Sequence, residues 1–334
     1  MQDLIFKLCK AGGVSGNEEN IAKTISGELS DVAEVFVDKH FNNVTAKIGK
    51  KNSPRKILMD AHLDNIGMLV TTIENGFLRV SMLSKLDRRI LPGSKLKIFG
   101  NKIIEGIVSS VPPHLSKKGQ ELRELEEIVV DVAMKKEGVE KIIPLGSYVG
   151  FSGEPQALVS GKIASPSLDN KIGVAVLIET AKILSKKKLN LELNFLFSSR
   201  EESGGYVGAT IGSWSIKPTE AIVVDVTFAN QPGVLAGESS LISKGPSIGF
   251  APNLSKKIFK NLKFVAKKNK IPHQIEVMSN ATHTNADTIC TNQKGVPTGL
   301  ISIPIRNMHS IFEVADLEDI KNTVKLLTKY ISEV

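Results

Sequence analysis

Residues 59–70, MDAHLDNIGMLV, place polar side chains inside a segment that is otherwise typical of a buried β-strand. Apolar residues at 57–59 lead into it and mostly apolar residues at 66–70 lead out, but His62 and Asp64 lie between them. Burying an imidazole and a carboxylate costs several kcal/mol unless each group is paired or bound to something. The stretch therefore predicts a strand whose polar side chains find partners elsewhere in the chain.

The segments on both sides of this strand have the pattern of an α/β protein. Before it, apolar residues recur at helical spacing over residues 4–10 and 18–29, and strands are expected at 32–37 and 44–49. Strands alternating with helices predict a sheet with helices on both faces. After residue 160 we expect helices at 172–184, 253–269 and 317–334, and strands at 191–199, 221–226, 273–278 and 298–304.

The segment between these two parts has a different pattern. From about residue 69 to 160, short strand-like runs alternate with turn residues, and helical periodicity is visible only near 119–125. A β-rich segment that interrupts an α/β chain indicates an insertion. We therefore predict an α/β fold in which residues 1–68 and 161–334 form a three-layer domain, with a mixed central sheet flanked by helices. Residues 69–160 are predicted to form an inserted small β-barrel-like domain.

Composition narrows the functional classes. The net charge of +8 comes with lysines in short solvated runs and only 5% aromatic residues, which argues against a nucleic-acid-binding surface with stacking side chains. No apolar run approaches the roughly 18–20 residues of a membrane span, and residues 1–13 lack the features of a signal peptide. Cys9 and Cys290 lie in unlike contexts and are expected to be reduced thiols. We expect a cytoplasmic protein that binds neither nucleic acid nor membranes.

Acids and histidines recur at the ends of predicted strands or at the start of a helix. The carboxyl ends of strands in an open α/β sheet converge on a ligand-binding crevice. Imidazole and carboxylate groups together suit zinc, cobalt or manganese. These positions are His62 with Asp64, Asp169, Glu201 with Glu202, Asp225, and His309.

Each position also has an ordinary explanation when it is taken alone. A buried histidine is usually a hydrogen-bonded core residue, and an acid such as Asp169 at a helix start interacts favourably with the helix dipole. Asp225 could belong to a turn, and the glutamate pair or His309 could be solvated. The chain has only six histidines, however, and two of them lie in such positions. The combined pattern therefore favours a metal site.

Glu201 and Glu202 are neighbours, and neighbouring side chains on a regular strand point to opposite faces. Both can serve one site only where the strand ends in an irregular turn, which the following Ser-Gly-Gly supplies. This arrangement suits one acid as a metal ligand and the other as a general base acting on a bound water, whose pKa zinc can lower to about 7.

Five motifs in order resemble those of a known family. They are MDAHLDNIG, SPSLDNKIG, SREESGG, VVDVTFANQPG and PIRNMHSIFE, supplemented by GVSGNEE and KGVPTGLISIP. The pattern is similar to that of the glutamyl-aminopeptidase and tetrahedral (TET) aminopeptidase family of di-metal exopeptidases. This family includes FrvX-like proteins and proteins labelled as endoglucanases. The resemblance covers nearly the whole chain, and the ordered set is far more specific than any single motif.

The resemblance implies a metal centre with two divalent ions per subunit, zinc or cobalt by preference, with manganese as a further candidate. Asp169 would bridge both ions, and a non-proline cis peptide bond would follow it. His62 and Asp225 would complete the ligands of one ion, and Glu202 and His309 those of the other.

The resemblance also implies roles for two acids outside the ligand set. Glu201 would be the general base, and Asp64 would hold the second nitrogen of the His62 imidazole, as ligating histidines usually require.

The chain departs from the family pattern at a few positions. Asn170 replaces the usual second aspartate after Asp169, Lys171 replaces an arginine, and Asn285 stands where Thr-Asp-Ala is usual. The glutamate motif also carries one extra residue. None of these changes removes a ligand, so they bear on the substrate pocket around 283–289 rather than on the metal centre.

The leading interpretation is an aminopeptidase that removes the N-terminal residue from short peptides. The alternatives are a di-metal deacylase of N-acyl amino acids, whose inserts usually have a βαβ pattern, a glycosidase, or a non-catalytic shell protein. The resemblance further implies a homo-oligomer, with a tetrahedral dodecamer as the expected form and residues 69–160 contributing to its interfaces or to substrate access.

Overall fold

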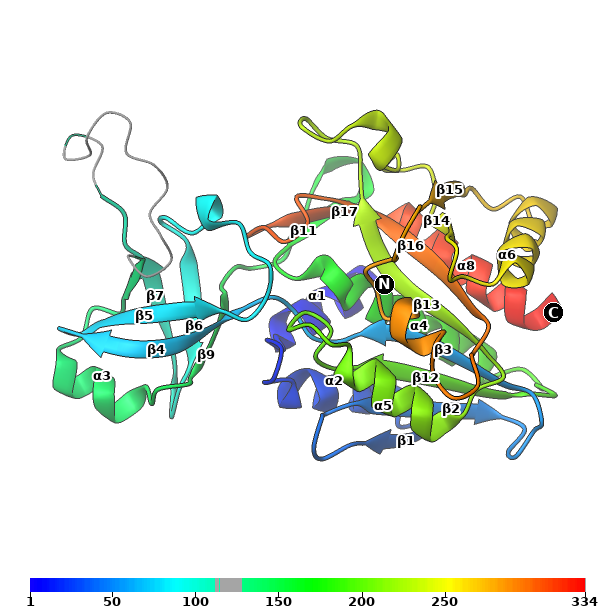
Figure 1. Cartoon of the computed structure of the whole chain (residues 1–334), viewed down its shortest axis with the longest axis horizontal. Coiled ribbons are helices and arrows are strands. Elements are labelled where there is room, and N and C mark those ends of the chain that lie inside the picture. Colours follow the sequence, from blue (N-terminus) through cyan, green and yellow to red (C-terminus); the bar gives the residue numbers. More distant parts are fainter. Residues whose placement is uncertain (112–113, 115–127, 334) are drawn as a thin grey trace.

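The computed structural model describes residues 1–111, 114 and 128–333 (Figure 1). Its largest element is a sheet in the order β1-β2-β12-β3-β13-β16-β17-β11-β10, with β14 paired to β16 and β15 paired to β14. The strands are β1 (Glu34–Val37), β2 (Val44–Gly49), β3 (Lys56–His62), β10 (Gln156–Ala157), β11 (Lys162–Ser165), β12 (Glu192–Ser198), β13 (Glu220–Phe228), β14 (Ser247–Phe250), β15 (Gln274–Val277), β16 (Thr298–Arg306) and β17 (Glu313–Asp316).

Parallel pairing in the middle of this sheet sets the position of the functional residues. β3 pairs in parallel with β12 and β13, and β13 pairs in parallel with β16. β2 and β17 pair antiparallel to their neighbours, so the sheet is mixed. The carboxyl ends of β3, β12, β13 and β16 therefore lie at one edge, where ligands bind in α/β proteins.

Alternating side chains bury both faces of the sheet. On β3, Met59 packs into the core that contains α4, whereas Leu58 packs with Leu196 against the opposite layer. The first layer consists of α1 (Gln2–Ala11), α2 (Glu19–Leu29), α4 (Leu168–Leu184), α6 (Lys256–Lys268) and α8 (Leu317–Glu333). The opposite layer contains α5 (Val207–Ile216) and α7 (Ala286–Ile289).

A closed six-stranded barrel lies to one side of this sheet in Figure 1. Its own core includes Met68, Leu96 and Val149, each of which is fully buried. The strands are β4 (Met68–Glu74), β5 (Phe77–Met82), β6 (Lys95–Phe99), β7 (Ile103–Val108), β8 (Val129–Asp131) and β9 (Tyr148–Phe151). Helix α3 (Lys136–Ile142) and the short 3₁₀ helix η1 (Arg88–Ile90) accompany them.

The predicted fold class is confirmed: a mixed sheet flanked by helices, and a small barrel. Helices α3, α5 and α7 were not predicted, and the helical pattern at 119–125 lies outside the described residues. Cys9 and Cys290 are both free, as expected. Within the described part of the chain, no helix combines the length and hydrophobicity that crossing a membrane requires.

Candidate metal centre

The structure brings every candidate residue to the carboxyl ends of the central strands. His62 ends β3, Asp225 lies in the second half of β13, and Glu201 and Glu202 occupy the turn after β12. The remaining candidates, Asp169 at the start of α4 and His309 in the loop after β16, approach from other elements. Residues up to about 250 positions apart in sequence therefore share one site.

Asp169 lies between the two histidines. Its Oδ1 is 3.1 Å from Nε2 of His62, and its Oδ2 is 3.3 Å from Nε2 of His309. Asp225 Oδ1 lies 3.6 Å from the same nitrogen of His62, and Glu202 Oε1 lies 3.5 Å from that of His309. The two oxygens of Asp169 thus face two separate groups of donor atoms. The cis peptide bond expected between Asp169 and Asn170 is present.

These groups fit divalent metal ions. In the set His62, Asp169 and Asp225, and likewise in the set Asp169, Glu202 and His309, one donor atom per residue lies within 4.8 Å of the others. His62, Glu201 and Glu202 satisfy the same criterion. Imidazole nitrogens and carboxylate oxygens are suitable ligands for zinc and related ions. The shared Asp169 is the donor that a site for two ions requires.

Both histidines have their second ring nitrogen engaged by a main-chain carbonyl. Nδ1 of His62 lies 3.2 Å from the carbonyl oxygen of Asp64, and Nδ1 of His309 lies 3.2 Å from that of Lys85. A carbonyl oxygen can only accept a hydrogen bond, so Nδ1 carries the hydrogen, and Nε2 of the neutral ring is the nitrogen that could bind a metal ion. The Lys85 carbonyl belongs to the loop that follows barrel strand β5, which links the barrel to the centre.

The Asp64 carboxylate has a different set of contacts from its carbonyl. It lies 3.6 Å from Nδ1 of His62, but its two oxygens accept hydrogen bonds from the backbone N–H groups of Glu201 and Glu202, each at 3.0 Å. Arg200, immediately before the pair, has a φ of 57°, which breaks the extended strand. Asp64 therefore holds the irregular turn in which both glutamates can face the same site.

Charge in this cluster is dominated by carboxylates. Burial alone would lower the pKa of both histidines, but Asp169 together with Asp225 and Asp64 raises that of His62 well above its ordinary value. Asp169 and Glu202 raise the pKa of His309 to about 11. Without metal ions, the histidines must hold protons to offset the buried acids. Divalent cations would replace those protons.

Glu201 is a partly buried acid, and within the described part of the chain no ion pair joins it to His62 or His309. Burial raises its pKa well above the usual range, and the neighbouring charges of Asp225 and Glu202 raise it further, while His62 lowers it. An acid with a raised pKa beside the donor groups is a candidate for accepting and releasing a proton.

Three further residues support the centre; Glu313 and Lys85 were not singled out from the sequence, and Lys171 was noted only as a departure from the family pattern. Glu313 accepts hydrogen bonds from the backbone N–H groups of Asp169 and His309, both at 2.9 Å. Lys171, which is fully buried, donates to the carbonyl of Leu63 and to Asn65. The third is Lys85. Glu313 does belong to the PIRNMHSIFE motif, where an acid four residues after His309 was the available signal.

The departures from the family pattern are accommodated by hydrogen bonds. Asn170 Nδ2 donates to the carbonyl of Val224, next to Asp225, and its Oδ1 accepts from the N–H of Gly173. Asn285 Nδ2 donates to Asp60 and to Ser198. Burial raises the pKa of Asp60 to about 7. These residues brace the strands beneath the donor groups.

The candidate ligands line a cavity of about 1220 Å³. Residues 82–85 of the barrel side and residues 275–284 form parts of its wall, and His283 lies on its rim rather than in the donor cluster. Asp287 fixes this rim, because it accepts hydrogen bonds from the N–H groups of Thr282 and His283 at 3.0 and 2.9 Å. The cavity is large enough for a peptide end beside the donor groups.

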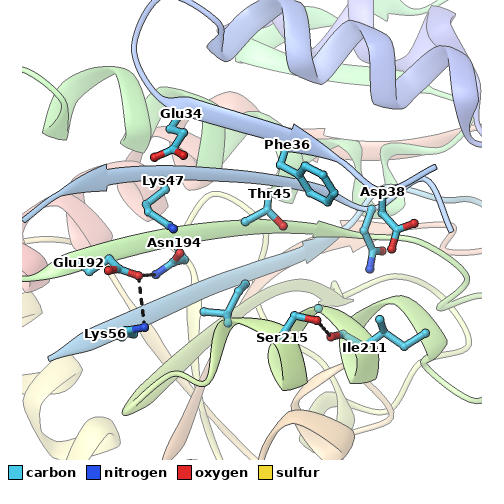
Figure 2. A pocket seen from close by; sticks show the side chains of 13 residues that line it. Glu34, Phe36, Asp38, Thr45, Lys47, Lys56, Glu192, Asn194, Ile211 and Ser215 are labelled. Carbon is cyan, nitrogen blue, oxygen red and sulfur yellow. Dashed lines mark hydrogen bonds and ion pairs between the residues drawn. The ribbon is translucent and has the colours of Figure 1, made fainter. Parts of the chain in front are cut away.

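A second, smaller cavity of about 290 Å³ lies between β1, β2 and β12 and helix α5 (Figure 2). Its buried acid, Glu192, already accepts a hydrogen bond from Asn194 at 3.3 Å and lies 3.8 Å from the ammonium of Lys56. No histidine or cysteine is found among the described residues that line it. The larger cavity is therefore the candidate active site.

Comparisons with known proteins agree with this geometry. A sequence model of the M42 glutamyl aminopeptidase family matches residues 42–326. The lysyl aminopeptidase of Pyrococcus furiosus is 34% identical over 340 residues, which cover 99% of this chain and 96% of that protein. An aminopeptidase structure from Desulfurococcus kamchatkensis has a TM-score of 0.92 at 32% identity and covers 100% of this chain and 94% of that one. The TET1 peptidase of Pyrococcus horikoshii, which can assemble into a tetrahedron or a large octahedral shell, has a TM-score of 0.88 at 28% identity and covers 99% of both chains.

Proposed function

The chain belongs to the M42 glutamyl aminopeptidase family, and from this premise we propose that it removes the N-terminal residue of short peptides at a centre of two divalent metal ions. The family assignment makes it a metal-dependent aminopeptidase. The observation that carries the two-ion proposal is Asp169, whose two oxygens face Nε2 of His62 and Nε2 of His309 separately. Zinc and cobalt are the preferred ions, with manganese as a further candidate.

The proposed ligand sets follow the two groups of donors. His62 and Asp225 hold one ion, Glu202 and His309 hold the other, and Asp169 bridges them. The bonds from Nδ1 of both histidines to main-chain carbonyls support these assignments, because they direct Nε2 toward the ions.

The ions and Glu201 would supply different parts of the hydrolysis reaction. Two bound divalent cations polarise the scissile carbonyl and lower the pKa of the attacking water. Glu201 accepts the proton that the water loses and delivers it to the nitrogen of the leaving amine. Its raised pKa, caused chiefly by burial, suits both steps. Asp64 holds Glu201 in position through its backbone N–H.

The domain roles and the assembly are also part of the proposal. Residues 1–68 and 161–334 would form the catalytic domain, and the inserted residues 69–160 would serve oligomerisation and substrate access. The tetrahedral assembly of the Pyrococcus horikoshii relative supports a homo-oligomer of the same symmetry. Tetrahedral rotational symmetry has twelve equivalent positions, which suggests a dodecamer. The two free cysteines support a location in the cytoplasm.

Release of the chromophore from a panel of aminoacyl anilides, with and without added cobalt or zinc, tests the activity. We expect metal-dependent release from unblocked substrates and none from their N-acetylated counterparts. Absence of metal-dependent release from every unblocked substrate would overturn the aminopeptidase proposal. Metal-dependent release of acetate from N-acetyl amino acids, without chromophore release from the unblocked anilides, would favour the deacylase alternative.

A further inference from the structure

Lys85 lies on the wall of the active-site cavity, in the loop between β5 and η1 that reaches the cavity from the barrel side. We propose that its ammonium group binds a free carboxylate of the substrate, so that the enzyme prefers dipeptides and tripeptides over longer chains. This inference rests on the aminopeptidase function proposed above and adds a recognition element to the same site.

The loop that carries Lys85 is held on both sides and in the middle. The N–H of Leu83 donates to the carbonyl of Gly67 at 2.9 Å, and Asp87 caps η1 by accepting from the N–H of Arg89 at 2.9 Å. Between these anchors, the carbonyl of Lys85 accepts from Nδ1 of His309 at 3.2 Å. The backbone of Lys85 is therefore fixed beside the metal centre, while its side chain is exposed.

The Lys85 ammonium differs in charge from the acids that line the same cavity. Among the described residues that line the cavity, Lys85 is the single lysine or arginine. No ion pair or hydrogen bond of its ammonium is found within the described part of the chain. Two divalent ions would offset the charges of the three carboxylate ligands and of Glu201. Of the other lining acids, Glu276 hydrogen bonds Thr227 and Glu238 is exposed.

Distances favour a carboxylate one or two residues beyond the bond that is cut. Only the imidazole ring of His309 separates the Lys85 carbonyl from Asp169, whose Oδ2 lies 3.3 Å from the far nitrogen of that ring. An extended peptide spans about 3.5 Å per residue, so the terminal carboxylate of a dipeptide or tripeptide lies roughly 3–7 Å past the scissile bond. The Lys85 backbone is anchored beside this ring, and its flexible four-carbon stem extends from there, which is compatible with an ammonium that reaches such a carboxylate.

The test compares substrates that differ only in a carboxylate. We would measure kcat/KM of the metal-loaded enzyme for Ala-Ala and Ala-Ala-amide, and for the anilides of glutamate and glutamine. The variants are Lys85→Met, Lys85→Arg, and Lys102→Met as a matched control on an exposed lysine of the barrel outside the cavity. The ratio within each substrate pair cancels general effects on folding and metal loading.

We expect the Ala-Ala to Ala-Ala-amide ratio to fall about tenfold in Lys85→Met, as loss of a charge-assisted bond predicts, and to survive in Lys85→Arg and Lys102→Met. A fall confined to the glutamate and glutamine pair would assign the carboxylate to the N-terminal side chain instead. Unchanged ratios for both pairs in Lys85→Met would overturn the proposal. Failure of the wild-type enzyme to hydrolyse any anilide would instead overturn the proposed function.

Discussion

Several residues at the centre make two kinds of contact at once, and Asp64 is the clearest case. Its carbonyl fixes the His62 ring, while its carboxylate accepts the N–H groups of Glu201 and Glu202. A single aspartate just after β3 therefore couples a proposed ligand to the turn that carries the proposed base. The neighbouring glutamates can differ in function because this turn, rather than a regular strand, positions them.

Substituting Glu201 by glutamine should remove turnover and leave the metal content unchanged. Glutamine preserves the shape of the side chain but cannot accept a proton, so kcat should fall by at least about 10²-fold, the range of a general base. Metal content by mass spectrometry and kcat on an aminoacyl anilide would measure the two effects. Substantial activity in Glu201→Gln would contradict the general-base assignment. A Glu202→Gln variant is the matched control and should lose metal instead.

Removing the Asp64 carboxylate should lower kcat as well as metal affinity, because this carboxylate holds the turn that carries Glu201. Asp64→Ala leaves two buried N–H groups without an acceptor and frees the Glu201 turn, so we expect kcat to fall even at saturating metal. Metal affinity should fall by about 10–100-fold, as for other residues that orient ligands. Titration of activity with zinc separates the two effects. Full recovery of kcat at high zinc would show that Asp64 acts only on metal binding.

At the scale of secondary-structure elements, the first residues of α4 contact β3, β13 and the segment just after β3. Asp169 turns toward the histidines, Asn170 reaches the carbonyl of Val224 on β13, and Lys171 reaches the carbonyl of Leu63 just after β3. Asp169 and Asn170 lack helical φ/ψ angles, which lets consecutive side chains diverge in this way. The first residues of α4 thus connect the β3 and β13 segments, and the regular helix begins after them.

Lys171 should be tested by a substitution that keeps its volume but removes its charge. Lys171→Met leaves the Leu63 carbonyl and the Asn65 side chain without their donor, and each buried unsatisfied group costs about 1–3 kcal/mol. We expect a clear loss of thermal stability by calorimetry, whereas Lys182→Met, a partly exposed lysine on the same helix, should cost less. Equal losses in the two variants would argue against a special role for the buried contact.

The carboxylate of Glu28 forms ion pairs that link three helices, and their contribution to stability should depend on pH. On α2, its carboxylate lies 2.6 Å from Lys7 of α1 and 2.7 Å from Lys182 of α4, and these lysines lower its pKa. Because the unfolded chain then binds the proton more tightly, the stabilisation is present above the unfolded pKa of about 4.5 and is lost as pH falls through the lower folded value.

The stability difference between the wild type and Glu28→Gln should therefore be about 0.5–1 kcal/mol at pH 7, allowing for solvent screening. It should shrink as the pH is lowered below about 4.5. Melting temperatures measured in parallel from pH 7 downward would detect the change. A difference that grows on acidification would have the wrong sign for this mechanism.

An element can be predicted from the sequence where its apolar residues follow a single helix or strand period. β2 lies at the predicted residues 44–49, and the strand ends that carry His62, Asp225 and His309 converge as expected. Helix α5 was not predicted, and it contains two residues of low helix propensity, Gly208 and Gly212. In the fold these glycines allow close packing: a Cβ on Gly212 would lie 2.5 Å from Leu196. A tertiary contact, which local pattern does not encode, thus overrides weak helix propensity.

The hydrogen bonds that support the candidate ligands join residues that are far apart in the sequence. The Lys85 carbonyl and His309 are 224 positions apart in sequence, and the Lys171 ammonium and Asn65 are 106 apart. Lysines in a sequence are usually solvated, so no pattern marks one as buried or as part of a cavity wall. The candidate ligands could be selected from the motifs, whereas the residues that contact them could be identified only in the three-dimensional fold.

In the whole molecule, the metal centre joins the barrel to the large sheet. His309, which follows β16, donates through Nδ1 to the carbonyl of Lys85 on the barrel side, and its own N–H is held by Glu313. Barrel and sheet have separate hydrophobic cores, and this polar contact connects the candidate metal centre to both parts.

Removing the metal should therefore destabilise the protein as well as inactivate it. Without cations, the acids Asp169, Glu202 and Asp225 remain beside one another in the interior, and protonated histidines together with the buried Lys171 offset them. A ligand at 1,000 times its dissociation constant stabilises the folded state by about 4 kcal/mol per site. We expect treatment with a chelator to abolish anilide hydrolysis and lower the melting temperature, and added zinc or cobalt to restore both. If the chelated protein lost activity but kept its melting temperature, the ions would not contribute to stability, and the acids would have to be neutralised by protons alone.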